Sequence, residues 1–293
     1  MKILFSDLDG TLLTDDKRIL DVDMAAIERM LSAGHKFLIT TGRPLYSAKK
    51  LAQKYGFFKP GFFLVSFNGG LIYDCGTGES ILTRNISVDD AKFIMDEAHR
   101  NGFHAHTYAG DLVISEYETE QLKNYCSIMG MDFLIVNDIR EYFGQSNVQA
   151  AVPNAPINVV VRPNDEGSAN SPIKVNVITP LDHSSLLDFR AEMRKTTEGK
   201  LFDVFSKPEM LEFSNLKTNK GDAVRFMADF YNVPLSETIA CGDEENDCPM
   251  ISAAGIGVAM ANASEIAKSC AKYITKCDNN HGGIAEVIDK FVF

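Results

Sequence analysis

The stretch that decides the fold is KILFSDLDGT, residues 2–11. Its first half is apolar and predicts a β-strand over Lys2–Ser6, and the acids Asp7 and Asp9 follow directly. In open α/β sheets, ligands bind beyond the carboxyl ends of the strands, which is where these two acids fall. Side chains two apart on an extended chain face the same way, so both carboxylates can converge on one site. Taken alone, the motif could also be an acidic turn that caps a helix.

Outward from this motif, strand and helix patterns alternate through residue 84. Strands are expected at Lys36–Thr40 and Phe62–Phe67, with helical spacing before each of them. The same alternation returns in the last quarter of the chain, where a helix is expected at Gly221–Tyr231 and a strand at Thr238–Cys241. Strand–helix–strand order predicts a parallel sheet with right-handed crossovers.

The middle of the chain, about residues 85–213, has a different pattern. Helical stretches such as Val88–Asn101 are separated by short strand-like runs in hairpin-like pairs, which are typical of an α+β module. Its most linker-like segment is RPNDEGSANSP, residues 162–172. We therefore predict an α/β fold with a doubly wound, Rossmann-like parallel-sheet core at 1–84 and 214–293. The α+β module at 85–213 would be an inserted cap domain.

Composition limits the classes of protein to consider. The 293 residues carry a formal net charge of −11, which argues against nucleic-acid binding because such domains concentrate positive charge. The six cysteines are scattered and form no CxxC pair, which fits the reducing cytoplasm. No apolar run is long enough for a signal peptide or a membrane span. We expect a small-molecule partner and neither a nucleic acid nor a membrane, and the oligomeric state stays open.

Three further polar motifs end predicted strands or open predicted helices. The turn Thr41-Gly42-Arg43 offers a hydroxyl and backbone N–H groups that suit a phosphate oxygen, or it is an ordinary N-cap. Lys220 opens a predicted helix and is either an anion-binding cation or a solvated surface residue. The stretch GDEEND, residues 242–247, supplies carboxylates for a hard cation such as Mg²⁺, or it is an acidic N-cap. A P-loop motif is absent from the sequence.

The four motifs, in this order around a long insertion, resemble those of the haloacid dehalogenase superfamily. They are Asp7-Leu8-Asp9-Gly10-Thr11, Thr41-Gly42-Arg43, Lys220-Gly221 and Gly242-Asp243-x-x-Asn246-Asp247. An insertion between the second and third motifs resembles the Cof-type subfamily, whose members carry a large α/β cap of type C2, or IIB. The stretch Asn68-Gly69-Gly70 also matches. Glu244, Cys248 and His281 depart from the usual pattern, and the sequence does not assign roles to Glu244 and His281.

The resemblance implies a Mg²⁺-dependent phosphatase that forms a phospho-aspartyl intermediate. Asp7 would be the nucleophile, and Asp9 would protonate the leaving group and then activate water. Asp9 must then be protonated near neutral pH, which a neighbouring carboxylate and partial burial are expected to favour. Mg²⁺ would be held by the side chains of Asp7 and Asp243 and by the backbone carbonyl of Asp9.

The same resemblance implies a phosphate-binding set. Thr41, Gly42, Lys220 and Asn246 would bind the phosphoryl oxygens, which carry the charge that develops during transfer. Asp247 would orient Lys220 or a water on the metal.

The substrate and the cap contacts are less defined. Sugar phosphates are the first expectation, and pyridoxal phosphate and flavin mononucleotide are also compatible with the resemblance. A phosphomutase that uses the same nucleophile and a non-catalytic binding module stay open as alternatives. In the cap, His104 and His106 fall on one face of a predicted strand. They indicate a satisfied polar strand face, or else a metal pair or a substrate contact.

Overall fold

The computed structural model describes residues 1–144, 171–179 and 182–293. It divides into two compact units, one formed by Met1–Leu82 with Thr218–Phe293 and the other by Thr83–Lys217. The sequence analysis placed the corresponding divisions after residue 84 and after residue 213, two residues later and four residues earlier than these. The linker-like segment lies outside the described residues except for its last two positions.

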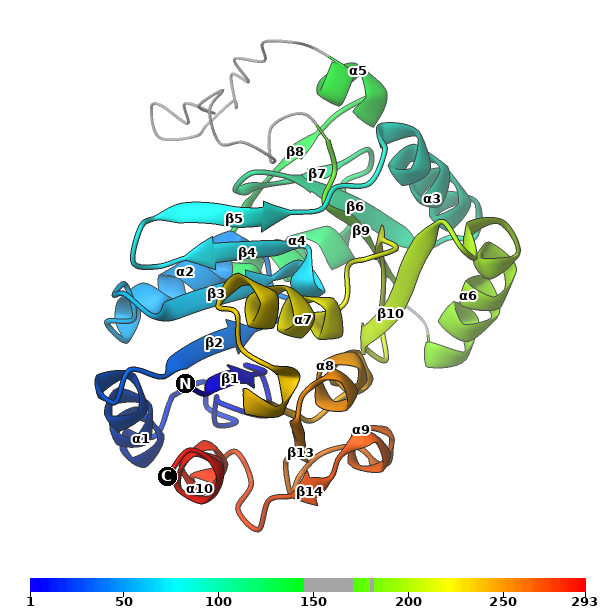
Figure 1. The fold of residues 1–293 in the computed structure, drawn as a ribbon. Coiled ribbons are helices and arrows are strands. Elements are labelled where there is room, and N and C mark those ends of the chain that lie inside the picture. Colours follow the sequence, from blue (N-terminus) through cyan, green and yellow to red (C-terminus); the bar gives the residue numbers. More distant parts are fainter. Residues whose placement is uncertain (145–170, 180–181) are drawn as a thin grey trace. The chain divides into compact units, whose positions relative to one another are not determined.

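The first unit is built on an eight-stranded sheet with the order β14-β13-β12-β1-β2-β3-β4-β5 (Figure 1). Six of its strands pair in parallel: β1 (Ile3–Ser6), β2 (Lys36–Thr40), β3 (Phe62–Ser66), β12 (Thr238–Gly242), β13 (Ile256–Ala259) and β14 (Tyr273–Ile274). The chain runs outward from β1 through β2 and β3, and later outward on the other side of β1 through β12 and β13. The sheet order therefore reverses at β1, as in doubly wound folds.

Two strands at one edge of this sheet were missed by the sequence analysis. β4 (Leu71–Asp74) pairs antiparallel with β3, and β5 (Glu79–Thr83) follows it at the edge. Both are short, and the tight turn before β4 removes the helix that separates parallel strands.

Helices accompany the parallel strands because each crossover must bury an apolar face against the sheet. The α-helices of this unit are α1 (Asp21–Ser32), α2 (Leu45–Lys54), α7 (Lys220–Phe230), α8 (Cys248–Ala253), α9 (Glu265–Cys270) and α10 (Gly283–Phe291). Short 3₁₀ turns lie at η1 (Phe67–Gly69), η2 (Leu235–Glu237) and η3 (Glu245–Asp247). The central parallel strands are buried on both faces, and every residue of β1 and β3 is buried.

The second unit contains a six-stranded mixed sheet with the order β10-β11-β9-β6-β7-β8. Its strands are β6 (His104–Ala109), β7 (Leu112–Ser115), β8 (Asp132–Ile135), β9 (Lys174–Ile178), β10 (Leu201–Lys207) and β11 (Met210–Asn215). Its helices are α3 (Val88–Arg100), α4 (Glu120–Met129), α5 (Ile139–Gly144) and α6 (His183–Thr197). β11 runs past residue 213, so this unit ends later than the sequence indicated.

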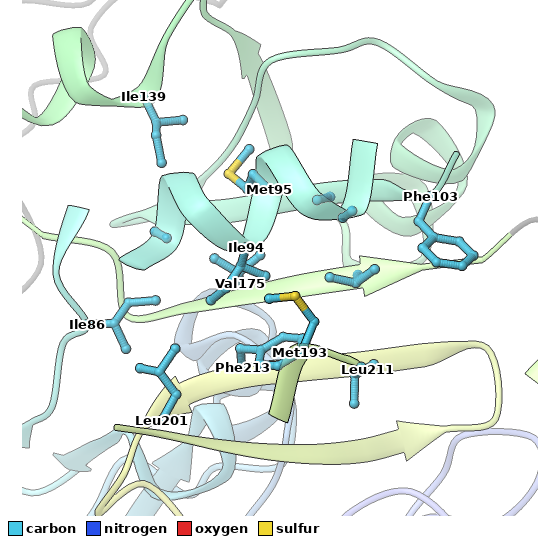
Figure 2. Close-up of a cluster of buried hydrophobic side chains, with 14 of the residues drawn as sticks. Ile86, Ile94, Met95, Phe103, Ile139, Val175, Met193, Leu201, Leu211 and Phe213 are labelled. Carbon is cyan, nitrogen blue, oxygen red and sulfur yellow. The ribbon is translucent and has the colours of Figure 1, made fainter. Parts of the chain in front are cut away.

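The hydrophobic core of the second unit lies between this sheet and its helices. Figure 2 shows Ile94 of α3 close to Val175 of β9, with Met193 of α6 beside Leu211. The strand residues that enter this core alternate with polar residues on the other face of the sheet, as Ala105 does between His104 and His106.

Candidate active site

The candidate site forms where three neighbouring strands end. Ser6 at the end of β1 pairs with Ile39 of β2 and with Cys241 of β12. Because these strands are parallel, the residues that follow them emerge at one edge of the sheet. The backbone N–H of Asp7 continues the ladder by donating to the Cys241 carbonyl at 2.9 Å. The fold thereby brings Asp7 next to the residues that follow Gly242.

A buried lysine lies between two of the acids. The Lys220 Nζ is 2.5 Å from Asp7 Oδ1 and 2.5 Å from Asp247 Oδ1. Lys220 is fully buried at the first position of α7, and Asn219 caps that helix by accepting from Asp222 N–H. The sequence therefore placed Lys220 correctly at a helix start, and the structure excludes the alternative of a solvated surface lysine.

Charge crowding controls the protonation of this cluster. Burial, and then the charge of Asp247, raise the pKa of Asp7 to about 7, although Lys220 opposes the shift. Burial alone would lower the pKa of Lys220, but Asp247 and Asp7 together raise it above its ordinary value. The lysine is therefore a permanent ammonium that neutralises only part of the negative charge around it.

Asp243 is the third buried acid, and it follows β12. Its Oδ1 accepts a hydrogen bond from Thr11 Oγ1 at 2.7 Å. Burial, followed by the charges of Asp7 and Asp247, raises the pKa of Asp243 to about 9. A Cβ atom at Gly10 would lie 2.3 Å from Asp243 Oδ2, and Gly10 has a φ of +82°. Only glycine therefore allows the first motif to pass so close to this carboxylate.

Oxygen atoms of Asp7, Asp243 and Asp247 all lie within 4.8 Å of one another. The Lys220 ammonium contacts two of these three buried carboxylates, and hard cations such as Mg²⁺ prefer such oxygen donors. The donor set therefore fits a divalent cation. Asp7 and Asp243, the side-chain ligands expected from the sequence, lie in this cluster together with Asp247, which was expected as an orienting residue. Asp247 also accepts from the backbone N–H groups of Asp243 and Glu244 through Oδ2, at 2.9 and 3.0 Å.

Asp9 has a different environment from the one that the sequence indicated. Its carboxylate accepts two hydrogen bonds from Arg43, and Lys17 Nζ lies 2.8 Å from Oδ1. Burial would raise the pKa of Asp9, but Arg43, and then Lys17, lower it to about 2. The expectation that its surroundings favour protonation near neutral pH is wrong for this arrangement. The sequence pattern does not show that Arg43 and Lys17 face Asp9, and these two cations stabilise its ionised form.

The expected phosphate-binding residues lie around the same strand ends. Thr41 follows β2, is buried, and donates its N–H to the Val65 carbonyl of β3 at 2.8 Å. The Thr41 hydroxyl accepts from Arg43 N–H at 3.1 Å, which closes the turn around Gly42. Asn246 lies in η3, beside Asp247, and its amide donates to the side chain of Asn68 at 3.1 Å. The contact to Asn68 was missed, although the sequence analysis had noted the Asn68-Gly69-Gly70 stretch.

Glu244 and His281, to which the sequence assigns no role, both have structural partners. Glu244 caps η3 in a reciprocal arrangement with Asp247, and its burial raises the pKa of its carboxyl. His281 is exposed, and its Nδ1 lies 2.5 Å from Asp278 Oδ1. Neither contact gives these side chains a chemical role in the site.

The two cap histidines form part of a buried hydrogen-bond chain. His104 Nδ1 bonds with Thr119 Oγ1 at 2.9 Å, and the chain continues to His106 at 2.9 Å and to Tyr108 at 3.2 Å. Burial lowers the pKa of His104 to about 3, so this ring is neutral. Among the described residues, neither histidine belongs to a metal-binding cluster. This geometry supports the interpretation that the two histidines form a polar strand face whose side chains are hydrogen-bonded to one another and to their neighbours.

Comparison with known proteins decides the family. A family model described as haloacid dehalogenase-like hydrolase matches residues 4–288, nearly the whole chain. The chain belongs to this family. The resemblance drawn from the four motifs is confirmed.

Relatives and solved structures match this chain over nearly its whole length. A protein of Streptococcus pyogenes serotype M6 is 29% identical over 296 residues, which span 100% of this chain and 98% of the relative. The Bacillus subtilis 5-amino-6-(5-phospho-D-ribitylamino)uracil phosphatase YitU is 27% identical, across 97% of this chain and 95% of its own. The structure of a subclass IIB sugar phosphatase covers 100% of this chain and 99% of its own, with a TM-score of 0.78 and 19% identity.

These matches establish the reaction class and the fold. The hydrolase is a phosphoric monoester hydrolase of the haloacid dehalogenase type, with a mixed α/β fold built on a parallel-sheet core. No helix within the described ranges is both long and apolar enough to cross a membrane.

Proposed function

We propose that this hydrolase is a Mg²⁺-dependent phosphatase that transfers phosphate from a small metabolite to Asp7 and then to water. The observation that carries the proposal is the buried carboxylate of Asp7 at a strand end, in contact with the ammonium of Lys220 and close to Asp243. A buried carboxylate held at one position is suited to form an aspartyl-phosphate, because it meets the substrate without reorganisation.

The chain's own residues would act mainly by positioning and charge. Phosphoryl transfer develops charge on the equatorial oxygens, and Lys220 is the buried cation available to neutralise it. Thr41, the Gly42 backbone and Asn246 would bind those oxygens. Asp7, Asp243 and Asp247 would hold Mg²⁺, with the Asp9 carbonyl as a further proposed ligand. When bound, the ion would shield the anionic phosphate from the anionic nucleophile.

Asp9 would serve as the acid and then the base of the reaction. Its ion pair with Arg43 and Lys17 favours the ionised form, which suits the base that activates water. Protonation of the leaving oxygen by Asp9 then requires the contact with Arg43 to open first. A phosphate group competes with a carboxylate for an arginine, so substrate binding itself supplies a reason for that opening.

Sugar phosphates are the substrate class that we propose. The support is that a relative is named for a phospho-D-ribityl compound and that a structural neighbour is described as a sugar phosphatase.

Phosphomutase action on the same Asp7 intermediate is the second candidate function. The presence of Asp7, Asp9 and Asp243 argues against a non-catalytic binding module. A cytoplasmic location belongs to the proposal and is supported by the free state of all six cysteines.

The test is a screen of phosphorylated metabolites with the purified chain and Mg²⁺. We expect free phosphate from one or more sugar phosphates and no activity in excess chelator. An isomerised sugar phosphate without free phosphate would establish the mutase instead, and full activity in chelator would reject the metal.

A further inference from the structure

Three consecutive residues after β3 adopt left-handed backbone conformations. Phe67, Asn68 and Gly69 have φ angles of 53°, 55° and 98°. Side chains other than glycine are strained in this region by roughly 1–2 kcal/mol. Phe67 and Asn68 are nevertheless both buried. A strained and buried segment next to a candidate site calls for a functional explanation, because surrounding contacts must hold it in place.

The backbone of this segment is tied to the phosphate-binding turn. Phe67 N–H donates to the Arg43 carbonyl at 3.1 Å, and Asn68 N–H donates to the Thr41 carbonyl at 3.0 Å. These two bonds flank Gly42 on both sides. The segment thus holds the turn in which the Gly42 backbone would bind a phosphoryl oxygen.

The same segment approaches the loop that carries Lys220. A Cβ atom at Gly69 would lie 2.5 Å from the Asn219 carbonyl oxygen, so no side chain fits there. Asn219 is the N-cap of α7, and Lys220 is the first residue of that helix. The left-handed turn therefore lies against both the Thr41-Gly42-Arg43 turn and the start of the helix that carries Lys220.

The Asn68 side chain completes the connection to the fourth motif. Its Oδ1 accepts from Asn246 Nδ2 at 3.1 Å, and both residues are buried. A Cβ atom at Gly42 would lie 3.2 Å from the same Oδ1. The Asn68 oxygen is therefore placed between the Gly42 turn and the Asn246 amide, and one of the two N–H bonds of that amide is occupied.

We propose that Asn68 is a positioning residue that orients the Asn246 carboxamide for the phosphoryl group. By taking one N–H of Asn246, Asn68 fixes the amide plane and leaves the second N–H for a phosphoryl oxygen. The left-handed backbone is required because it points the Asn68 side chain at Asn246 while its N–H still bonds to Thr41. This inference rests on the proposed role of Asn246 in phosphate binding.

A purely structural explanation makes a different prediction. Asparagine tolerates left-handed backbone better than most residues, so Asn68 could be present only for the turn. Glycine satisfies that requirement with less strain. Asn68→Gly therefore keeps the backbone and removes only the carboxamide, which separates the two explanations.

The experiment compares kcat and KM for Asn68→Gly, Asn246→Ala and the double variant, with Asn232→Gly as control. Asn232 is a second left-handed asparagine, with a φ of 50°, and lies after α7 away from the site residues. We expect Asn68→Gly to lower kcat about tenfold, as the loss of one oriented hydrogen bond does, with the thermal midpoint retained. Asn232→Gly should leave kcat unchanged.

The double-mutant cycle decides whether Asn68 acts through Asn246. If it does, the double variant should be no slower than Asn246→Ala alone. If the kcat losses of the two single variants multiply in the double variant, the two residues act independently and the inference is overturned. An unchanged kcat in Asn68→Gly, with Asn246→Ala impaired, would also overturn it. Full activity of Asn246→Ala would instead reject the proposed role of Asn246, and the positioning of Asn68 with it.

Discussion

Arg43 binds Asp9 through two hydrogen bonds, from Nε to Oδ2 and from Nη2 to Oδ1, each 2.6 Å long. This geometry is the bidentate arrangement in which a guanidinium best matches a carboxylate. The contact joins the first sequence motif to the second. It also holds the expected proton donor of the reaction as an anion.

Replacing Arg43 should raise the pKa of Asp9. In the wild-type chain this pKa is lowered to about 2, with Arg43 as the main stabilising partner of the carboxylate. Arg43→Gln removes the charge, so the titration midpoint of Asp9 should move up toward the ordinary value of about 4. The midpoint can be followed by NMR of the Asp9 carboxyl carbon.

Lys17→Gln is the matched control for this measurement. Lys17 makes one contact to Asp9 and is more exposed than Arg43, so its removal should produce a smaller upward shift. An unchanged midpoint in Arg43→Gln, or a larger shift in Lys17→Gln, would show that another group controls Asp9.

Asp9→Asn should separate substrates by their leaving groups. An amide cannot protonate the leaving oxygen, so turnover of an alkyl phosphate should fall by about 10²–10⁴-fold. Formation of the phospho-enzyme from p-nitrophenyl phosphate should fall much less, because nitrophenolate leaves without a proton. Pre-steady-state release of nitrophenol checks this, and equal losses for both substrate types would argue against Asp9 as the acid.

Asp243→Asn should weaken divalent-cation binding and also stabilise the metal-free protein. The substitution removes one of three buried carboxylates that crowd together, while the side-chain oxygen at this position can still accept from Thr11. Thermal unfolding with and without Mg²⁺ checks both effects, because a ligand that binds the native state raises the midpoint. A wild-type response to Mg²⁺, or a lower midpoint in chelator, would contradict this account of the cluster.

Asp23 gives a prediction about stability and pH away from the active site. Its carboxyl is buried under α10, accepts from Ala285 N–H at 2.7 Å, and has its pKa raised by burial from 3.8 to about 6. Between these pH values the folded state retains a proton that the unfolded state has lost, so this group destabilises the fold as the pH rises. The Asp23→Asn variant has no ionisable group at this position, so its stability does not fall with pH for this reason.

The difference in unfolding free energy between Asp23→Asn and wild type should therefore change with pH. It should move in favour of the variant by on the order of 2–3 kcal/mol between about pH 4 and pH 7. Urea unfolding at a series of pH values measures it. A difference that is flat with pH would mean that Asp23 titrates alike in both states.

The sequence predicted those parts of the fold that depend on local pattern. Asp7, Thr41 and Asp243 were placed at strand ends because an apolar run followed by a polar turn is visible in one dimension. The antiparallel strand β4 was not predicted, because its four residues follow a tight turn and carry no long periodic signal.

Side-chain contacts between residues distant in the sequence were also missed. The contacts of Asp9 with Arg43 and of Asn246 with Asn68 depend on how strand ends meet, which local patterns do not encode.

Detection of the covalent intermediate tests the central claim most directly. The enzyme is mixed with a sugar phosphate and Mg²⁺, quenched in denaturant during turnover, and treated with borohydride, which reduces an aspartyl-phosphate to homoserine. Peptide mass spectrometry then locates the change. The account predicts homoserine at position 7 and its absence in Asp7→Asn, which should also be inactive. Homoserine at another position, or substantial turnover by Asp7→Asn, would contradict it.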